Sequence, residues 1–420
     1  VRSFNTRVLY LDGLEELQCE IEKIGADPAG VKIMAPKGLF RVIKLEDVGY
    51  AAANILKQEM LALGAEAAIA GDIYFGEREG SDVLLLGTLR CYRRLIPKLR
   101  AQPLPTLQAV ADAVTEALER CAGPGLRARA RGAMEIGGRL FEWGQRTYVM
   151  GIINVTPDSF SGDGLAAEED VLEAALAQAE RFVADGAHIF DVGGESTRPG
   201  SEPTSTEDEL ERVIPVIERL AEKFELPISV DTYKAEVARQ ALDAGAGLVN
   251  DVWGLRMDPA LAGLVAERGV PVVVMHNRSE PKKAVQKERL GGRYEGMEYE
   301  DLMADVVREL RESVQLALDA GVARERIIVD PGLGFGKTVG QNLELMHRLS
   351  ELEVLGCPIL VGPSRKSFVG YTLDLPMEER VEGTAATVSL CIARGADIVR
   401  VHDVREMARV ARMSDAIVRR

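Results

Sequence analysis

Short acidic and amide side chains stand at the ends of apolar, β-rich runs in the second half of the sequence. Asp231, Asn250 and Asp330 each lie at or next to the end of such a run. Carboxylate and amide oxygens accept hydrogen bonds, and a carboxylate matches the paired N–H donors of an amidine-like edge. We therefore expect these three residues to bind a flat heterocycle that carries several N–H donors.

A second group of side chains at similar positions suits an anion with several oxygens. Its members are Asn154, Thr197, Arg198, Arg400 and His402. Arg binds phosphate oxygens especially well because its planar guanidinium presents a fork of donors. Lys366, in the run Ser364–Ser367, could serve the ring or the anion. The two groups together predict a site for a flat polar ring joined to a phosphate-bearing tail.

The segment Gly334–Thr338 reads GFGKT and ends like a phosphate-binding P-loop. A P-loop needs a glycine five residues before the glycine that precedes the lysine. That position is Pro331, so the spacing fails and we do not expect a nucleoside triphosphate here. Glycines at 332, 334 and 336 instead favour a backbone that lies close to a flat ligand.

These residues belong to a repeating pattern of short strands and longer amphipathic helices. Gly-Ala or Gly-Val steps close many of the helical runs, as expected where a helix leads into a strand. The expected strands are Tyr148–Asn154, His188–Gly193, Ile228–Asp231, Leu248–Val252, Pro271–His276, Arg326–Asp330, Pro358–Gly362 and Asp397–His402, and clear helical runs are Asp170–Asp185, Glu207–Phe224 and Asp301–Ala320. Eight strands that alternate with helices predict a (β/α)8 TIM barrel, whose reacting groups gather at the strands' C-terminal ends. An open doubly wound sheet is the structural alternative.

The first third of the chain does not follow this repeat. It contains strand-like and helical runs: Arg7–Leu11, Phe40–Leu45 and Asp82–Leu86, and Leu14–Ile24, Val48–Leu63 and Leu107–Arg120. We expect a smaller α/β domain over residues 1–139, which ends in a linker at Ala122–Gly138, and the barrel over residues 140–420. This first domain shows no catalytic constellation, and its role is open.

Length and composition agree with a barrel of roughly 250 residues plus a smaller domain. The 420 residues carry a net charge of −15, which argues against nucleic-acid or anionic-membrane binding. The five cysteines are scattered, without a CxxC pair, which indicates reduced thiols in a cytoplasmic protein. We also find no long uncharged apolar stretch and no signal-like N-terminus.

Two long motifs carry a resemblance to a known family. Gly151–Ser161 reads GIINVTPDSFS and Asp191–Ser201 reads DVGGESTRPGS, and both resemble signatures of the dihydropteroate synthases. The similarity continues through Val230–Thr232, Asn250–Asp251, Val274–His276, Asp330–Phe335, Ser364–Ser367 and Arg400–Asp403. It covers about Tyr148 to Arg420, so the N-terminal domain lies outside it.

The resemblance implies the condensation of (7,8-dihydropterin-6-yl)methyl diphosphate with 4-aminobenzoate, which releases pyrophosphate along an SN1-like path. It implies Mg²⁺ as the cofactor, with Asn154 as its ligand, and a homodimer. The implied pterin contacts are Asp231, Asn250, Met275, Asp330, Phe335 and Lys366. The implied pyrophosphate contacts are Asn154, Thr197, Arg198, Arg400 and His402. The implied p-aminobenzoate contacts are Phe160, Pro199 and Ser367, and the reaction would depend most on Asn154, Asp231, Lys366, Arg400 and His402.

One loop departs from the family pattern. Ser161 is followed by Gly162, Asp163 and Gly164, whereas the usual order places the aspartate directly after the serine. The pairing of that aspartate with Arg198, which the resemblance would imply, is therefore open.

Two other functions remain as alternatives at this stage. One is a methyltransferase that moves a methyl group from methyltetrahydrofolate to a corrinoid protein, because such barrels share the acidic and amide pterin contacts. Thr197–Pro199 and Ser364–Ser367 argue against it, since a methyl donor has no pyrophosphate to neutralise. The other is a non-catalytic pterin-binding paralogue, which the presence of Asn154, Arg198 and Arg400 disfavours.

Overall fold

The computed structural model describes residues 5–11, 13–121, 132–156, 168–196, 200–280, 284–287 and 290–419. The chain divides into two compact units, Val1–Ala130 and Arg131–Arg420. Within the described residues, every helix is too short or too polar to span a membrane. The expected Phe160, Asp163, Thr197, Arg198 and Pro199 lie outside the described residues.

The first unit is a small α/β domain, as expected. Its three strands form an antiparallel sheet in the order β1-β3-β2. The elements are α1 (Leu14–Lys23), α2 (Pro28–Gly38), β1 (Phe40–Gly49), α3 (Tyr50–Ala62), β2 (Glu66–Ala68), η1 (Gly71–Phe75), β3 (Gly80–Thr88), α4 (Leu89–Arg100) and α5 (Pro105–Arg120). Alternate residues of β3, such as Val83 and Leu85, are buried in the core of this unit. The strand expected at Arg7–Leu11 is wrong, because these residues pair with no strand and are mostly exposed.

Eight parallel strands form the barrel of the second unit. They are β6 (Tyr148–Asn154), β7 (Ile189–Gly193), β8 (Ile228–Asp231), β9 (Leu248–Asp251), β10 (Val272–Met275), β13 (Ile327–Asp330), β14 (Leu360–Val361) and β15 (Ile398–Val401). Each strand pairs with the next along the chain from β6 to β13, while β15 pairs with both β14 and β6. A parallel bridge between Val329 and Ile359 joins β13 to the segment before β14, so the sheet closes on itself. The TIM barrel is therefore confirmed, and the open sheet is not formed.

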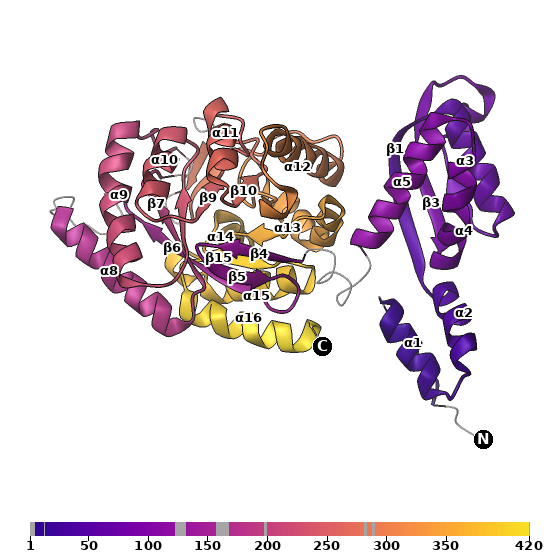
Figure 1. Ribbon diagram of the computed structural model, residues 1–420, viewed down its shortest axis with the longest axis horizontal. Helices are drawn as coiled ribbons and strands as arrows, with labels where there is room; N and C mark the ends of the chain where they lie inside the picture. Colours follow the sequence, from indigo (N-terminus) through magenta and orange to yellow (C-terminus); the bar gives the residue numbers. More distant parts are fainter. Residues whose placement is uncertain are drawn as a thin grey trace. The chain divides into compact units, whose positions relative to one another are not determined.

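Helices surround these strands as an outer layer (Figure 1). They are α8 (Glu168–Asp185), α9 (Thr206–Lys223), α10 (Ala235–Asp243), α11 (Pro259–Arg268), α12 (Leu302–Asp319), α13 (Val339–His347), α14 (Ser367–Leu373), α15 (Val381–Ala393) and α16 (Val404–Val418), with short 3-10 turns η2 (Arg324–Arg326), η3 (Leu349–Leu355) and η4 (Met377–Glu379). Apolar helix faces pack against the outward-facing strand residues in one large core. Two short strands, β11 (Ala284–Lys287) and β12 (Gly291–Tyr294), form an antiparallel hairpin that the sequence analysis did not foresee.

The barrel interior is filled by one apolar residue from most strands. These residues are Met150, Ile189, Leu248, Val273, Ile328, Leu360 and Ile398, all fully buried. Side chains alternate across a strand, so the residue two positions later faces the same interior one layer higher. Those positions hold Ile152, Asp191, Asn250, Met275, Asp330, Gly362 and Arg400. The polar residues of the site therefore lie one layer above the apolar residues that fill the barrel interior.

An antiparallel hairpin lies against the other end of the barrel interior. It consists of β4 (Ala133–Ile136) and β5 (Arg139–Glu142). Phe141 and the following Trp143 pack with Tyr148 and the interior residues in one buried cluster. The linker and the boundary expected at 139/140 would divide this hairpin, whereas the two compact units separate before it, between residues 130 and 131.

Candidate active site

Four strands bring polar side chains to the C-terminal mouth of the barrel. Asp191 and Asp231 lie on the neighbouring strands β7 and β8, and Asn250 lies on the next strand, β9. Arg400 comes from β15, which is separated from β7 by β6 alone. Because the barrel closes, residues from the two ends of the unit meet at one place. The structure thus brings together three of the residues that the sequence predicts.

Arg400 pairs with two carboxylates at once. Its Nε donates to Asp191 Oδ2 at 2.5 Å, and its Nη2 donates to Asp231 Oδ2 at 2.6 Å. The Asn250 amide nitrogen also donates to Asp191, at 3.3 Å. From the sequence, Asp191 was expected in the strand His188–Gly193 and at the start of the second motif, but it was given no role. The alternation of side chains along the strand could have identified it. Asp191 lies two residues after Ile189, so its side chain also faces the barrel interior, where it is fully buried.

The electrostatics of this network follow from burial. Burial raises the pKa of Asp231 to about 7, with Arg400 acting against the rise and Asp191 adding to it. The pKa of Arg400 is raised because Asp191 and Asp231 outweigh the effect of its burial. A guanidinium has five N–H donors. Arg400 therefore has N–H donors beyond the two that it gives to the aspartates.

Asp330 and Lys366 form the opposite side of the mouth. Asp330 ends β13, and its Oδ1 accepts from the backbone N–H of Gly332 at 2.7 Å. Burial raises the pKa of the Asp330 carboxyl, with the charge of Lys366 opposing the rise. Burial lowers the pKa of Lys366 to about 8, while Asp330 opposes that fall. The carboxylate and the ammonium thus lie close enough for each charge to shift the pKa of the other, and each can contact a polar ring.

An apolar wall stands beside these charges. Met275 and Phe335, both expected from the sequence, pack with Val252 and Tyr294 in one buried cluster. The Tyr294 and Phe335 rings stack with 5.8 Å between their centroids, and Lys366 Nζ lies 4.6 Å from the Phe335 centroid. The sequence analysis missed Tyr294 because it belongs to the unforeseen β12. A flat ring could therefore lie between an apolar wall and polar groups at its edge.

The Gly-rich loop after β13 is held tightly against β10. Gly332 has a φ of +68°, and a Cβ atom there would lie 1.9 Å from the carbonyl oxygen of His276. Lys337 is buried and donates to His276 Nδ1, Gly332 O and Phe335 O at 3.0–3.1 Å. Lys337, the lysine of the P-loop-like sequence, therefore stabilises the Gly-rich loop through these hydrogen bonds. Its neighbours in the sequence gave no sign of this role, because His276 lies 61 residues earlier, just after β10.

Of the expected anion contacts that the structure describes, Asn154 ends β6, Arg400 lies on β15 and His402 follows it. Ser364 Oγ accepts from the backbone N–H of His402 at 3.1 Å and lies 3.0 Å from His402 Nδ1. If the serine hydroxyl donates to Nδ1, the ring proton is on Nε2, where it can donate to an anion. Asn154 ends β6 and Ser367 begins α14, and both are partly exposed.

Comparisons with known proteins agree with this arrangement. The pterin-binding enzyme family matches residues 150–402. The dihydropteroate synthase of Bacillus subtilis is 51% identical over 274 residues, which are 65% of this chain and 90% of that protein. A crystal structure of the Clostridium difficile dihydropteroate synthase with pteroic acid is 46% identical with a TM-score of 0.61, and the match covers 67% of this chain and all of that one.

Another relative also resembles the first unit. A probable bifunctional folylpolyglutamate synthase/dihydropteroate synthase of Halobacterium salinarum is 42% identical over 409 residues. This match covers 97% of the present chain and 46% of the relative, so it includes the small α/β unit as well as the barrel. Taken with the match to the family over most of the barrel, these likenesses show that the chain belongs to the pterin-binding enzymes, among the dihydropteroate synthases.

Proposed function

We propose that this protein condenses (7,8-dihydropterin-6-yl)methyl diphosphate with 4-aminobenzoate to give 7,8-dihydropteroate and pyrophosphate. The observation that carries the proposal is the barrel mouth, where the charges of Asp231, Asp330, Lys366 and Arg400 act on one another and Lys366 lies over Phe335 of the apolar wall. Carboxylates suit the ring's N–H donors, and the cations suit its carbonyl and its diphosphate. The protein is thus a transferase of folate biosynthesis.

The pterin ring is assigned to the side of the mouth beside Met275 and Phe335. In this assignment Asp330 accepts from the ring N3–H and the 2-amino group, and Lys366 contacts the carbonyl side. Asp231 and Asn250 complete the hydrogen bonds at the ring edge. The apolar cluster of Met275, Phe335 and Tyr294 offers a surface for the ring face.

The diphosphate is assigned to the basic side of the mouth. Arg400 on β15 and His402 just after it bind the diphosphate in this assignment. Thr197 and Arg198 join them, as the resemblance to the family implies. Asn154 supplies a hard oxygen ligand for Mg²⁺, a cation that often takes one or two protein ligands and completes its shell with water and phosphate oxygens. The bound ion would neutralise charge on the diphosphate.

The reaction exchanges a carbon–oxygen bond for a carbon–nitrogen bond. The bond between the pterin methylene and the diphosphate oxygen breaks, and the oxygen keeps the electron pair. Conjugation with the ring stabilises the methylene cation, and Arg400 and His402 stabilise the leaving pyrophosphate. The amine of 4-aminobenzoate then attacks and loses a proton to solvent. A neutral aromatic amine needs no strong general base, so positioning and electrostatics account for most of the catalysis.

The second substrate is assigned to the outer part of the mouth. Phe160 and Pro199 cover its aromatic ring in this assignment, and Ser367 at the start of α14 donates to its carboxylate. The methyltransferase alternative is disfavoured by the relatives' names and by the extra cations, because a methyl donor carries no diphosphate. A non-catalytic paralogue is disfavoured by the intact network of Asp191, Asp231 and Arg400.

We also propose a cytoplasmic homodimer. All five cysteines are free thiols, which suits a reducing compartment. Leu390 on α15 and Met413 and Ile417 on α16 are exposed apolar residues on two helices that pack together, and they support a self-association surface there. Sedimentation equilibrium of the full chain should give twice the monomer mass, and a monomer mass at micromolar concentration would contradict the dimer.

The function is tested by supplying the full chain with both substrates and Mg²⁺. We expect 7,8-dihydropteroate and pyrophosphate in equal amounts, and no pteroate product when 4-aminobenzoate is left out. A parallel reaction offers methyltetrahydrofolate and a corrinoid acceptor. Methyl transfer without dihydropteroate formation would favour the alternative enzyme, and binding of pterin without either reaction would favour the non-catalytic paralogue.

A further inference from the structure

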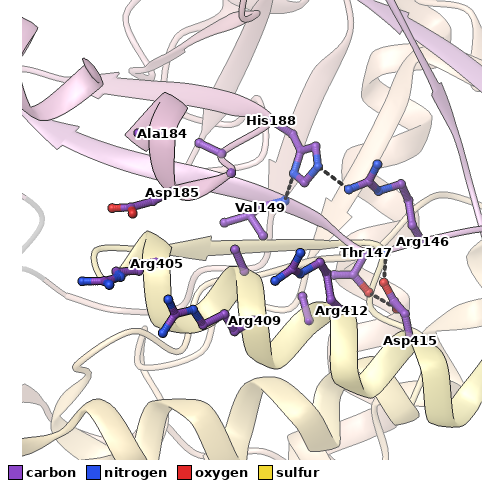
Figure 2. Close-up of a pocket in the computed structure, with 14 residues that line it drawn as sticks. Arg146, Thr147, Val149, Ala184, Asp185, His188, Arg405, Arg409, Arg412 and Asp415 are labelled. Atoms are coloured by element: carbon purple, nitrogen blue, oxygen red, sulfur yellow. Dashed lines mark hydrogen bonds between the residues drawn. The ribbon is translucent and has the colours of Figure 1, made fainter. Parts of the chain in front are cut away.

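A groove lined by arginines lies at the end of the barrel opposite the active-site mouth. It has a volume of about 670 Å³ and is bordered by the C-terminal end of α8, by α16 and by the residues just before β6 and β7. Arg405, Arg409 and Arg412 follow one another along α16, and His188 and Arg146 lie across the groove from them (Figure 2). None of the residues that line the groove is assigned to the proposed reaction.

The charge of the groove is opposite to that of the chain. Four arginines line it, against the two aspartates Asp185 and Asp415. Asp415 is already engaged, because its carboxylate accepts from the Thr147 backbone and hydroxyl at 2.7 Å and from Arg419 Nε at 2.7 Å. A cationic groove on a chain with a net charge of −15 is a local concentration of charge that attracts small anions.

The contact between Arg146 and His188 indicates which kind of ligand the groove would bind. The backbone N–H of Val149 donates to His188 Nδ1 at 2.9 Å, so Nδ1 is an acceptor and the ring proton is on Nε2. Arg146 Nη2 lies 2.7 Å from that Nε2. A guanidinium has only donors, so two N–H groups lie side by side here, too close for an atom between them. An oxygen could accept from both once the exposed Arg146 side chain turns away from the ring.

We propose that this groove binds a small phosphate-type anion, with His188 Nε2–H and Arg146 as its anchors and Arg409 and Arg412 as supporting cations. Inorganic phosphate and pyrophosphate share the required chemistry, which is several acceptor oxygens with two or more negative charges. Arg suits such oxygens because its donors form a planar fork. Chloride, with a single charge and no fork of oxygens, would be a poorer occupant.

The test follows the four histidines of the full chain by ¹⁵N NMR of their ring nitrogens. The His188 signals are assigned from their loss in His188→Asn. Phosphate should move the His188 signals in a saturable way, whereas chloride at equal ionic strength should not. Titrations with pyrophosphate distinguish the two sites. Binding at the mouth moves the signals of His402, and binding in the groove moves those of His188.

A matched pair of variants completes the experiment. Arg409→Gln with Arg412→Gln should weaken the phosphate titration at His188 by about tenfold or more, as expected for lost charge-assisted contacts. Arg239→Gln with Arg311→Gln removes the same charge from exposed positions elsewhere on the barrel and should leave the titration unchanged. Thermal unfolding verifies that both proteins are folded. The proposal would be overturned if neither anion shifts the His188 signals, or if both double variants lose phosphate affinity equally.

Discussion

Asp330 is a single buried carboxylate whose environment favours a ligand with paired N–H donors. Replacing Asp330 by Asn keeps its size but removes the charge and presents an N–H₂ group to the ring donors. We expect pterin affinity to fall by about 2–3 kcal/mol, the cost of a lost charge-assisted hydrogen bond. Calorimetry with a pterin ligand measures the change, with Asp319→Asn at an exposed position as the control. An affinity equal to that of the unchanged protein would remove Asp330 from the pterin site.

His188 makes the stability of the barrel depend on pH. Burial lowers its pKa to about 4, and the charges of Arg146 and Arg139 add to the fall while Asp415 opposes it. The folded-state pKa lies below the unfolded value of about 6.5, so unfolding takes up a proton between these pH values. The stability that neutral His188 provides is present above pH 6.5 and is lost as the pH falls towards 4.

His188→Asn retains an acceptor for the Val149 N–H but cannot be protonated. In phosphate-free buffer, the free energy of unfolding of the unchanged protein should fall by about 2–3 kcal/mol relative to this variant between pH 7 and pH 4. Denaturant unfolding at several pH values measures the difference. Parallel pH profiles for the two proteins would show that His188 is not the responsible group.

The loop after β13 depends on a close approach that only glycine permits. Gly332→Ala would place a Cβ atom 1.9 Å from the His276 carbonyl oxygen, on a backbone with a φ of +68°. We expect a loss of about 2 kcal/mol or more in stability, together with weaker pterin binding, because Asp330 and Phe335 are positioned by this loop.

Gly340 is a control for the same substitution on the following helix. It lies in α13, is exposed, and has open space around an added Cβ. Gly340→Ala should stabilise the protein by about 0.5–1 kcal/mol and leave binding unchanged. Thermal melts and pterin calorimetry of both variants check the pair. If Gly332→Ala and Gly340→Ala changed the stability in the same direction, the tight packing of the loop after β13 would be contradicted.

The molecule as a whole consists of a catalytic barrel and a unit whose role is open. A Clostridium beijerinckii dihydropteroate synthase is matched over its full length by 288 residues, or 68%, of this chain. We therefore expect a shortened chain that begins at Arg131 to fold and to keep its kcat/KM within about twofold of the full chain. A large loss in steady-state activity would instead assign the first unit a direct part in the reaction.

A chain that begins at Gly144 should behave differently. It lacks Met134, Ile136, Phe141 and Trp143, which are almost fully buried at the end of the barrel interior. Removal of even one large buried aromatic residue costs about 3–5 kcal/mol, so this chain should lose cooperative unfolding. Circular dichroism melts of the two shortened chains provide the comparison, and equal melting temperatures would show that the hairpin is dispensable.

The sequence by itself determined the barrel and many of the polar residues at its mouth. Strand residues alternate between two faces, and strands that alternate with helices all point the same way. Asp231, Asn250, Asp330 and Arg400 could therefore be assigned to one end of the barrel from their positions at strand ends alone. The long motifs of the family added the chemistry of the substrates. The local sequence pattern was sufficient here, because placing a residue at the end of a strand requires only that the strand and its last residues be identified.

The tertiary structure decided which of these residues touch. Arg400 meets Asp191 and Asp231 across separations of 209 and 169 residues, and no local pattern encodes such a pairing. Closure of the barrel creates it by placing β15 beside β6. The same reason applies to Lys337, whose partner His276 lies 61 residues earlier, just after β10. It applies also to the hairpin β4–β5, whose short strands give little sequence signal; Phe141 and the following Trp143 are buried only because they pack against the end of the barrel interior.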